Sequence, residues 1–231
     1  AVNATEALLL YSGGTSGVRD ERRRRRLLWT ILDVSTFRIY DAPGHVEGET
    51  ANFSIGPAGA NIEYTIRFRR VGNVWFVVVP SASDLRGDLN KMISSFGYDT
   101  LSQLREATAN SPRAAMRDFL MGMRTWRTGG RERALQALDL SFVPPRLLSF
   151  EAPLLADYLK QVIDRAGYVT WQEISNNPNR AGSYVFYRHP AGSIVIEQVA
   201  DLEGGQAKWK FSSDTLRNAP QLYGQMQGLP V

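Results

Sequence analysis

The stretch Trp209–Arg217 reads Trp-Lys-Phe-Ser-Ser-Asp-Thr-Leu-Arg and has the pattern of a strand that passes directly into a helix. Trp209 and Phe211 alternate with lysines, as expected of a strand with one buried face. The two serines and the aspartate that follow offer side-chain oxygens to the unpaired N–H groups of a helix's first turn. The stretch therefore predicts the last strand of a sheet and the helix that follows it.

A similar stretch occurs earlier in the chain. Residues Trp75–Arg86 read Trp-Phe-Val-Val-Val-Pro-Ser-Ala-Ser-Asp-Leu-Arg, again an aromatic strand followed by a helix start. Further matches stand in the same order in both halves, and this order indicates an internal duplication. The matched pairs are Asn3–Tyr11 with Ser111–Met123, Leu32–Ser35 with Leu138–Ser141, Pro57–Gly59 with Pro190–Gly192, and Trp75 with Trp209.

Each copy is predicted to contain two helices, a three-stranded antiparallel meander and a closing helix. Helices gathered on an antiparallel sheet make the fold class α+β. The predicted organisation is a first repeat at residues 1–96, a linker at 97–110, and a second repeat at 111–231 that has an extra helix at Pro153–Asp164.

Alternation of apolar and polar residues places the strands of the first meander. The third of them is apolar throughout, so we expect it to be covered on both faces. We expect Trp75 and Trp209 to anchor the two cores. The first meander is predicted at residues 51–55, 62–68 and 74–79, after a helix at Thr5–Tyr11 and short strands at 37–40 and 45–49.

The positive charge of the chain is concentrated in one place. The 231 residues carry 27 Lys and Arg against 23 Asp and Glu, for a net charge of +4. Five of the basic residues are the consecutive arginines 22–26, and without them 22 basic residues (27 − 5) face 23 acidic ones. A nucleic-acid-binding protein more often spreads basic residues over a face and interleaves aromatic ones. We therefore expect no nucleic-acid partner.

The arginine run lies near the start of a predicted helix whose first turn is acidic. Five consecutive residues occupy more than one helical turn, so their side chains cannot share one face. One interpretation is a solvated helix start that is neutralised by nearby acids. The other is contact with anionic headgroups or phosphates, and its candidate residues are Arg22, Arg23, Arg24, Arg25 and Arg26.

Residue types that carry chemistry are scarce. The chain has no cysteine, which excludes a disulfide framework, a thiolate metal site and a cysteine nucleophile. His45 and His189 lie in or beside predicted turns, outside any catalytic motif, and a metal site at His45–Glu49 is a weak match. Asp33 and Asp139 recur at helix ends, where a turn or capping role accounts for them. We therefore predict no catalytic residue, no metal and no cofactor, and a protein that is not an enzyme.

The second half of the chain resembles a region found ahead of the membrane domain in some bacterial proteins of the small-conductance mechanosensitive channel family. The resemblance covers about half of the chain, and it is carried by the order of the motifs. They are Ser111–Arg113 with Phe119-Leu120, Ala134–Ser141, Leu155–Arg165 and Trp209–Ser212. The family's pore helix and cytoplasmic domain have no counterpart in these residues.

The resemblance implies a non-catalytic, periplasmic portion of an oligomeric channel that opens under membrane tension. Such a portion would contribute to subunit packing, envelope contact or gating, and its partners would be other channel subunits. The resemblance also implies membrane-spanning helices encoded downstream of Val231. The alternative is a free-standing periplasmic ligand-binding module with a cleft between the two copies. The sequence identifies no small-molecule substrate.

Overall fold

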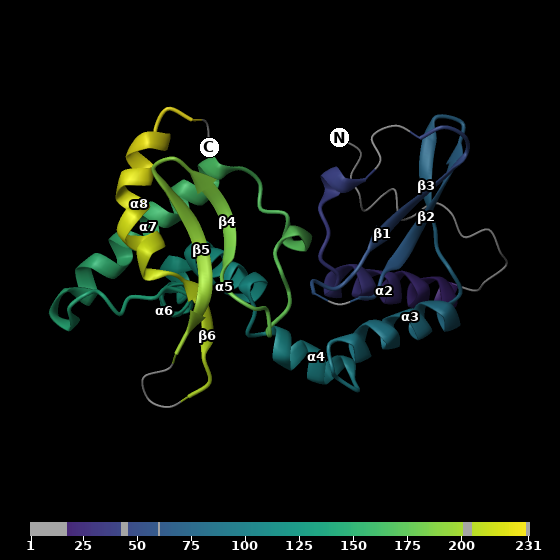
Figure 1. Cartoon of the computed structure of the whole chain (residues 1–231), viewed down its shortest axis with the longest axis horizontal. Coiled ribbons are helices and arrows are strands. Elements are labelled where there is room, and N and C mark those ends of the chain that lie inside the picture. Colours follow the sequence, from purple (N-terminus) through teal and green to yellow (C-terminus); the bar gives the residue numbers. More distant parts are fainter. Residues whose placement is uncertain (1–17, 43–45, 60, 201–204, 230–231) are drawn as a thin grey trace. The chain divides into compact units, whose positions relative to one another are not determined.

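The computed structural model describes residues 18–42, 46–59, 61–200 and 205–229 (Figure 1). The chain divides into two compact units, Ala1–Glu106 and Ala107–Val231. Each unit has its own three-stranded antiparallel sheet and a helix directly after it. The predicted α+β class is confirmed, and the two sheets are consistent with two copies of one design. The helix predicted at Thr5–Tyr11, and its match to Ser111–Met123, lie outside the described residues.

In the sequence of the first unit, the three strands follow helix α2 and precede helices α3 and α4. The strands pair in the order β1-β2-β3, with Phe53 of β1 opposite Ile66 of β2. The elements are α2 (Val18–Val34), the 3-10 turn η1 (Ile39–Asp41), β1 (Thr50–Ile55), β2 (Tyr64–Val71), β3 (Val74–Val78), α3 (Ala82–Ser95) and α4 (Leu101–Thr108).

The core of the first unit lies between its helices and one face of its sheet. Tyr64 and Ile66 of β2 are buried, whereas Thr65 between them is exposed, as the period of a strand requires. Leu104 of α4 is fully buried in this core, so part of the predicted linker packs against the first repeat. Those core residues come from α2, β1, β2, α3 and α4: Leu28, Ile31, Val34, Ile55, Tyr64, Ile66, Leu85, Leu89, Met92, Ile93 and Leu104.

The second unit has the same strand order and more helices. Its strands pair as β4-β5-β6, α8 contacts β5, and α7 packs against α8. The elements are α5 (Pro112–Arg124), η2 (Trp126–Thr128), α6 (Arg131–Gln136), η3 (Pro145–Leu147), α7 (Leu148–Ala166), η4 (Trp171–Glu173), β4 (Tyr184–His189), β5 (Gly192–Val199), β6 (Lys208–Phe211) and α8 (Ser213–Met226).

The strand-to-helix joint predicted from Trp209–Arg217 is confirmed. Trp209 is buried, and its indole N–H donates to the carbonyl of Pro178 at 3.0 Å. Ser212 caps α8, because its hydroxyl accepts the N–H of Thr215 at 3.1 Å. The earlier copy has the same cap, with Ser81 accepting the N–H of Asp84 at 3.2 Å.

The two copies differ where the third strand meets the core. Trp75 is only half buried and lies outside the buried cluster, so the prediction that it anchors a core is wrong. It contacts the guanidinium of Arg70 at 5.9 Å instead. The expectation that β3 is covered on both faces is also wrong, because Val74 is exposed and none of its residues is fully buried.

The matched segments Leu32–Ser35 and Leu138–Ser141 differ in structure, because residues 32–34 are the end of α2 whereas Leu138–Ser141 follows α6. Leu138 forms a parallel bridge with Phe211 of β6, the third strand of its sheet. Thr36 forms an antiparallel bridge with Gly56, next to β1, the first strand of its sheet. The sequence match at these segments therefore does not extend to their strand partners.

Two predicted short strands are absent from their places. Residues 37–40 contain the start of the 3-10 turn Ile39–Asp41 rather than a strand. Residues 46–49 form no strand either, because Gly48 has a φ of 94°, which takes the backbone out of the extended region. His45 lies outside the described residues.

The extra helix of the second repeat is longer than predicted. It was predicted to begin at Pro153, but α7 begins at Leu148 and contains Pro153 within it. A proline in a helix lacks the N–H that would bond the carbonyl four residues earlier. That carbonyl belongs to Ser149 and accepts from the guanidinium of Arg131 at 3.5 Å, which compensates for the missing bond.

Burial of Tyr64 predicts a loss of stability of the first unit at alkaline pH. Burial raises the pKa of Tyr64 to about 12, Asp88 adds to the rise, and Arg67 opposes it. Between pH 10 and 12 the unfolded chain loses this proton while the folded chain keeps it, so stability falls by about 2 to 3 kcal/mol as pH rises. Urea unfolding at a series of pH values should show this fall. Tyr64→Phe should reduce it, and an unchanged slope in that variant would contradict the assignment.

Candidate functional site

The acidic first turn of α2 neutralises two of the five predicted arginines. Arg24 lies 3.3 Å from the carboxylate of Asp20, and Arg25 forms an ion pair with Glu21. Both pairs are four residues apart, which places their side chains on the same side of the helix. Arg24 and Arg25 are partly buried. The structure therefore separates the run into two locally paired residues and three others.

Arg22, Arg23 and Arg26 are exposed, and a fourth exposed arginine, Arg19, shares their side of α2. Together the four have the spacing i, i+3, i+4 and i+7, which defines one face of a helix. We call Arg19, Arg22, Arg23 and Arg26 the arginine face. Sequence reasoning missed Arg19, because it stands outside the consecutive run.

An aromatic side chain extends the arginine face. Trp29 is 45% exposed and follows Arg22 and Arg26 by seven and three residues. Leu28 and Ile31, on the opposite side of α2, are fully buried in the core of the first unit. The core thus fixes the rotation of α2, and four cations with an adjacent indole face outward. Such a surface attracts phosphate and carboxylate groups.

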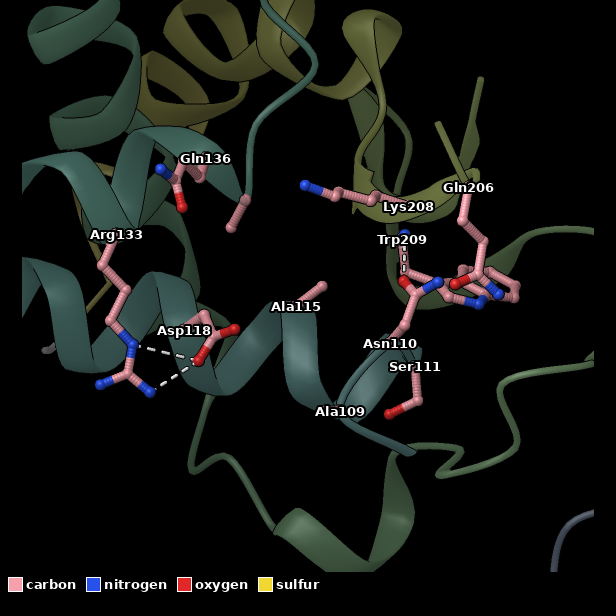
Figure 2. A pocket seen from close by; sticks show the side chains of 11 residues that line it. Ala109, Asn110, Ser111, Ala115, Asp118, Arg133, Gln136, Gln206, Lys208 and Trp209 are labelled. Atoms are coloured by element: carbon pink, nitrogen blue, oxygen red, sulfur yellow. Dashed lines mark hydrogen bonds and ion pairs between the residues drawn. The ribbon is translucent and has the colours of Figure 1, made fainter. Parts of the chain in front are cut away.

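A polar hollow of about 300 Å³ lies in the second unit, where the start of α5, α6 and β6 meet (Figure 2). Small residues leave the space open, among them Ala115 of α5. Its lining consists of Ala109, Asn110, Ser111, Ala115, Asp118, Arg133, Gln136, Ala137, Gln206, Lys208 and Trp209.

Much of the polar lining of this hollow holds the fold together. The Asn110 amide donates to the carbonyl of Ala207 at 2.8 Å and accepts the N–H of Trp209 at 3.0 Å. Arg133 makes two bonds to Asp118, at 3.0 and 2.6 Å (Figure 2). Lys208 extends from β6 over the hollow (Figure 2). The hollow could accept a small anion beside Lys208.

Two of the remaining predicted candidates, Asp139 and His189, make bonds that hold the second unit together. The Asp139 carboxylate accepts the N–H of Ser141 at 3.2 Å, and the N–H of Asp139 donates to the carbonyl of Phe211 at 2.9 Å. His189 accepts the N–H of Ala191 at 3.1 Å through Nδ1. The bonds that the Asp139 carboxylate and the His189 ring accept are turn bonds, which agrees with the turn roles expected from the sequence, whereas the bond from the Asp139 N–H joins its segment to β6.

One carboxylate of the second unit has a shifted pKa. Burial raises the pKa of Glu197, and the negative charges of Asp139 and Asp214 add to the rise. Within the described ranges, no group of three His, Asp or Glu side chains could hold a metal ion. Burial, together with repulsion from Asp139 and Asp214, accounts for the raised pKa of Glu197 without a ligand.

In the part of the chain that the structure describes, no helix combines the length and the apolar character needed to cross a bilayer. Searches with this chain against protein-family models, curated proteins and solved structures find no match.

Proposed function

We propose that the chain is a non-catalytic extramembrane module that contacts anionic groups of the bacterial envelope through the arginine face of α2. The observation that carries this proposal is the exposure of Arg19, Arg22, Arg23 and Arg26 on one side of a helix whose other side is buried. A basic face next to an anionic membrane gains roughly 1 kcal/mol per Lys or Arg near the surface.

The resemblance to small-conductance mechanosensitive channels supports a more specific role. The matching motifs all fall in the second unit, where Ser111 caps α5, Ala134–Ser141 spans the end of α6 and the following turn, and Trp209–Ser212 joins β6 to α8. In this proposal the module lies on the periplasmic side of the inner membrane, its partners are other subunits of a homo-oligomeric channel, and it contributes to assembly or gating.

A free-standing periplasmic ligand-binding module is the second candidate. The observation that favours it is the hollow beside Lys208. Its polar groups are largely engaged in bonds that hold β6 and α6 in place, so we rank it below the arginine face.

Vesicle binding tests the role of the arginine face. The variant Arg22→Gln, Arg23→Gln, Arg26→Gln should bind vesicles that contain phosphatidylglycerol at least roughly tenfold more weakly than the unchanged chain, because three headgroup contacts are lost. The free energy of unfolding should change little, because all three side chains are exposed. Co-sedimentation at two salt concentrations measures the partition coefficient and its electrostatic part.

A matched control removes the same charge elsewhere in the first unit. Arg38, Arg69 and Arg86 are exposed and lie outside α2. Their replacement by Gln should weaken binding much less, if the contact is local to the arginine face. If both triple variants weaken vesicle binding equally, binding depends on the net charge of the chain and not on the arginine face. That result would contradict the proposal. If the chain does not bind vesicles but small carboxylates raise its melting temperature, the result would favour the ligand-binding module.

A further inference from the structure

The hollow of the second unit has opposite charges on two of its walls. Lys208 extends over it from β6, and Asp118 faces it from α5 (Figure 2). Among the described residues, Asp118 forms its ion pair with Arg133 and not with Lys208. The hollow therefore presents separate positions for a negative and a positive group of one ligand.

The Asp118 carboxylate bonds to Arg133 through one of its two oxygens. The guanidinium donates twice to Oδ1, from Nε at 3.0 Å and from Nη2 at 2.6 Å. The other oxygen, Oδ2, points away from Arg133 and toward the hollow (Figure 2). A carboxylate accepts hydrogen bonds at both oxygens. Oδ2 can therefore accept a bond from a ligand while the ion pair with Arg133 stays in place.

Gln136 of α6 adds a neutral acceptor on the same side of the hollow. Its amide nitrogen donates to the carboxylate of Glu132 at 3.1 Å. An ionised carboxylate can only accept, so this bond fixes the orientation of the amide. The amide oxygen of Gln136 then points toward the hollow (Figure 2). Two acceptor oxygens, one of them charged, suit a group with several N–H donors, such as an ammonium.

Lys208 supplies the opposite charge from the side of β6. Its ammonium lies over the hollow and extends toward α6 (Figure 2). None of the ion pairs among the described residues involves Lys208. An ammonium in this position attracts a carboxylate, with which it makes a charge-assisted hydrogen bond.

We propose that the hollow binds a small α-amino acid in its zwitterionic form. The carboxylate of the ligand lies at Lys208, and its ammonium donates to Asp118 Oδ2 and to the amide oxygen of Gln136. The volume of about 300 Å³ is at the lower end for ligand pockets and favours a small side chain. Ala115 and Ala137, both buried, provide apolar wall for that side chain.

The Asp118 carboxylate is what selects a zwitterion over a plain anion. An anion beside Lys208 gains one attraction but is repelled by the charge of Asp118. An amino acid places an opposite charge at each wall and gains two attractions. The inference gives the ligand-binding candidate a class of ligand. It rests on the second unit alone and does not require the arginine face of the first unit.

Three related ligands test the two charged contacts separately. L-Alanine carries both charges, N-acetyl-L-alanine keeps only the carboxylate, and L-alaninamide keeps only the ammonium. Isothermal titration calorimetry with the whole chain should show L-alanine binding at least roughly tenfold more tightly than either analogue, because each analogue loses one hydrogen-bonded charge.

Two variants assign each charge of the ligand to its wall. Lys208→Gln should weaken L-alanine binding roughly tenfold or more and abolish the preference for L-alanine over L-alaninamide. Asp118→Asn should instead abolish the preference for L-alanine over N-acetyl-L-alanine. Lys210→Gln is the matched control, because it removes the same charge from β6 at a residue outside the lining of the hollow. The melting temperature of Lys208→Gln should stay the same, since Lys208 is exposed.

Three outcomes would overturn the inference. The first is that L-alanine does not bind at millimolar concentration. The second is equal binding of L-alanine and N-acetyl-L-alanine, which would make the hollow a plain anion site. The third is equal loss of binding in Lys208→Gln and Lys210→Gln, which would mean that binding depends on net charge.

Titration of the Arg22→Gln, Arg23→Gln, Arg26→Gln variant separates this inference from the proposed function. L-Alanine binding should persist in this variant, because the three arginines belong to the other unit. Loss of vesicle binding with retained L-alanine binding supports both proposals. L-Alanine binding by a chain that does not bind vesicles supports the hollow and contradicts the role of the arginine face.

Discussion

Replacing Phe211 by alanine is expected to lower the free energy of unfolding of the second unit by about 3 to 5 kcal/mol. The side chain is fully buried at the end of β6. Its ring packs edge-on against Phe119 of α5, with the ring centres 5.2 Å apart. Truncation therefore removes buried apolar area and an aromatic pair, and it leaves a cavity between sheet and helix.

Phe211 of β6 contacts both α5 and the segment after α6. The structure around a truncated side chain should therefore not collapse to fill the cavity. Its N–H donates to the carbonyl of Ala137, and its carbonyl accepts from Asp139, both at 2.9 Å. These backbone bonds fix β6 beside the segment after α6. The walls of the cavity are then held by main-chain contacts, and a fixed wall makes a large-to-small substitution costly.

Native-state hydrogen exchange measures this effect within the second unit. Amides of β5 should exchange faster in Phe211→Ala by the amount that corresponds to the lost stability. The matched control is Phe150→Ala, the same chemical change at an exposed position of the same unit, which should alter stability by less than about 0.5 kcal/mol. Similar effects of the two variants would show that Phe211 is not a centre of this core.

The features that the sequence predicted well depend on neighbours along the chain. The caps at Ser81, Ser111 and Ser212 each bond an N–H three residues later, so the local sequence contains both partners. Strand alternation at Tyr64 and Ile66 is equally local. The α+β class and the two meanders follow from such short-range patterns.

The features that the sequence missed depend on packing between distant segments. Trp75 and Trp209 occupy similar positions in the sequence pattern. The indole of Trp209 donates to the carbonyl of Pro178, whereas Trp75 pairs with Arg70 of the neighbouring strand. Leu104 gives no local sign of joining the first core.

The candidate surfaces were missed in part for a similar reason. The arginine run appeared uniform, and only the helix geometry with its acidic first turn shows that Arg24 and Arg25 are paired while Arg19 joins the exposed side. The start of α7 was misplaced because Pro153 is a strong signal for a helix start, whereas the helix begins at Leu148. The bond from Arg131 to the freed carbonyl of Ser149 is a tertiary contact that no local pattern reveals.

The packing of α5 against α6 predicts that one chemical change will have opposite effects at two helical glycines of the second unit. At Gly122, an added Cβ would lie 2.5 Å from the backbone nitrogen of Ala134 and 2.7 Å from its Cβ. Backbone cannot move aside as a flexible side chain does, so Gly122→Ala must push α6 away from α5. We expect a loss of about 1 to 3 kcal/mol, the usual cost of overpacking.

At Gly224 of α8, an added Cβ meets nothing within 4 Å, and the residue is exposed. Gly224→Ala should therefore raise stability by about 0.5 to 1 kcal/mol, because alanine loses less backbone entropy in a helix. Urea unfolding of both variants, followed by hydrogen exchange in α5 and α8, compares the two signs directly. Stabilisation by both substitutions would mean that α5 and α6 are not in the close contact described. Destabilisation at Gly122 alone would support the close contact between α5 and α6. It would also support the position of α6 at the wall of the hollow that Arg133 and Lys208 line.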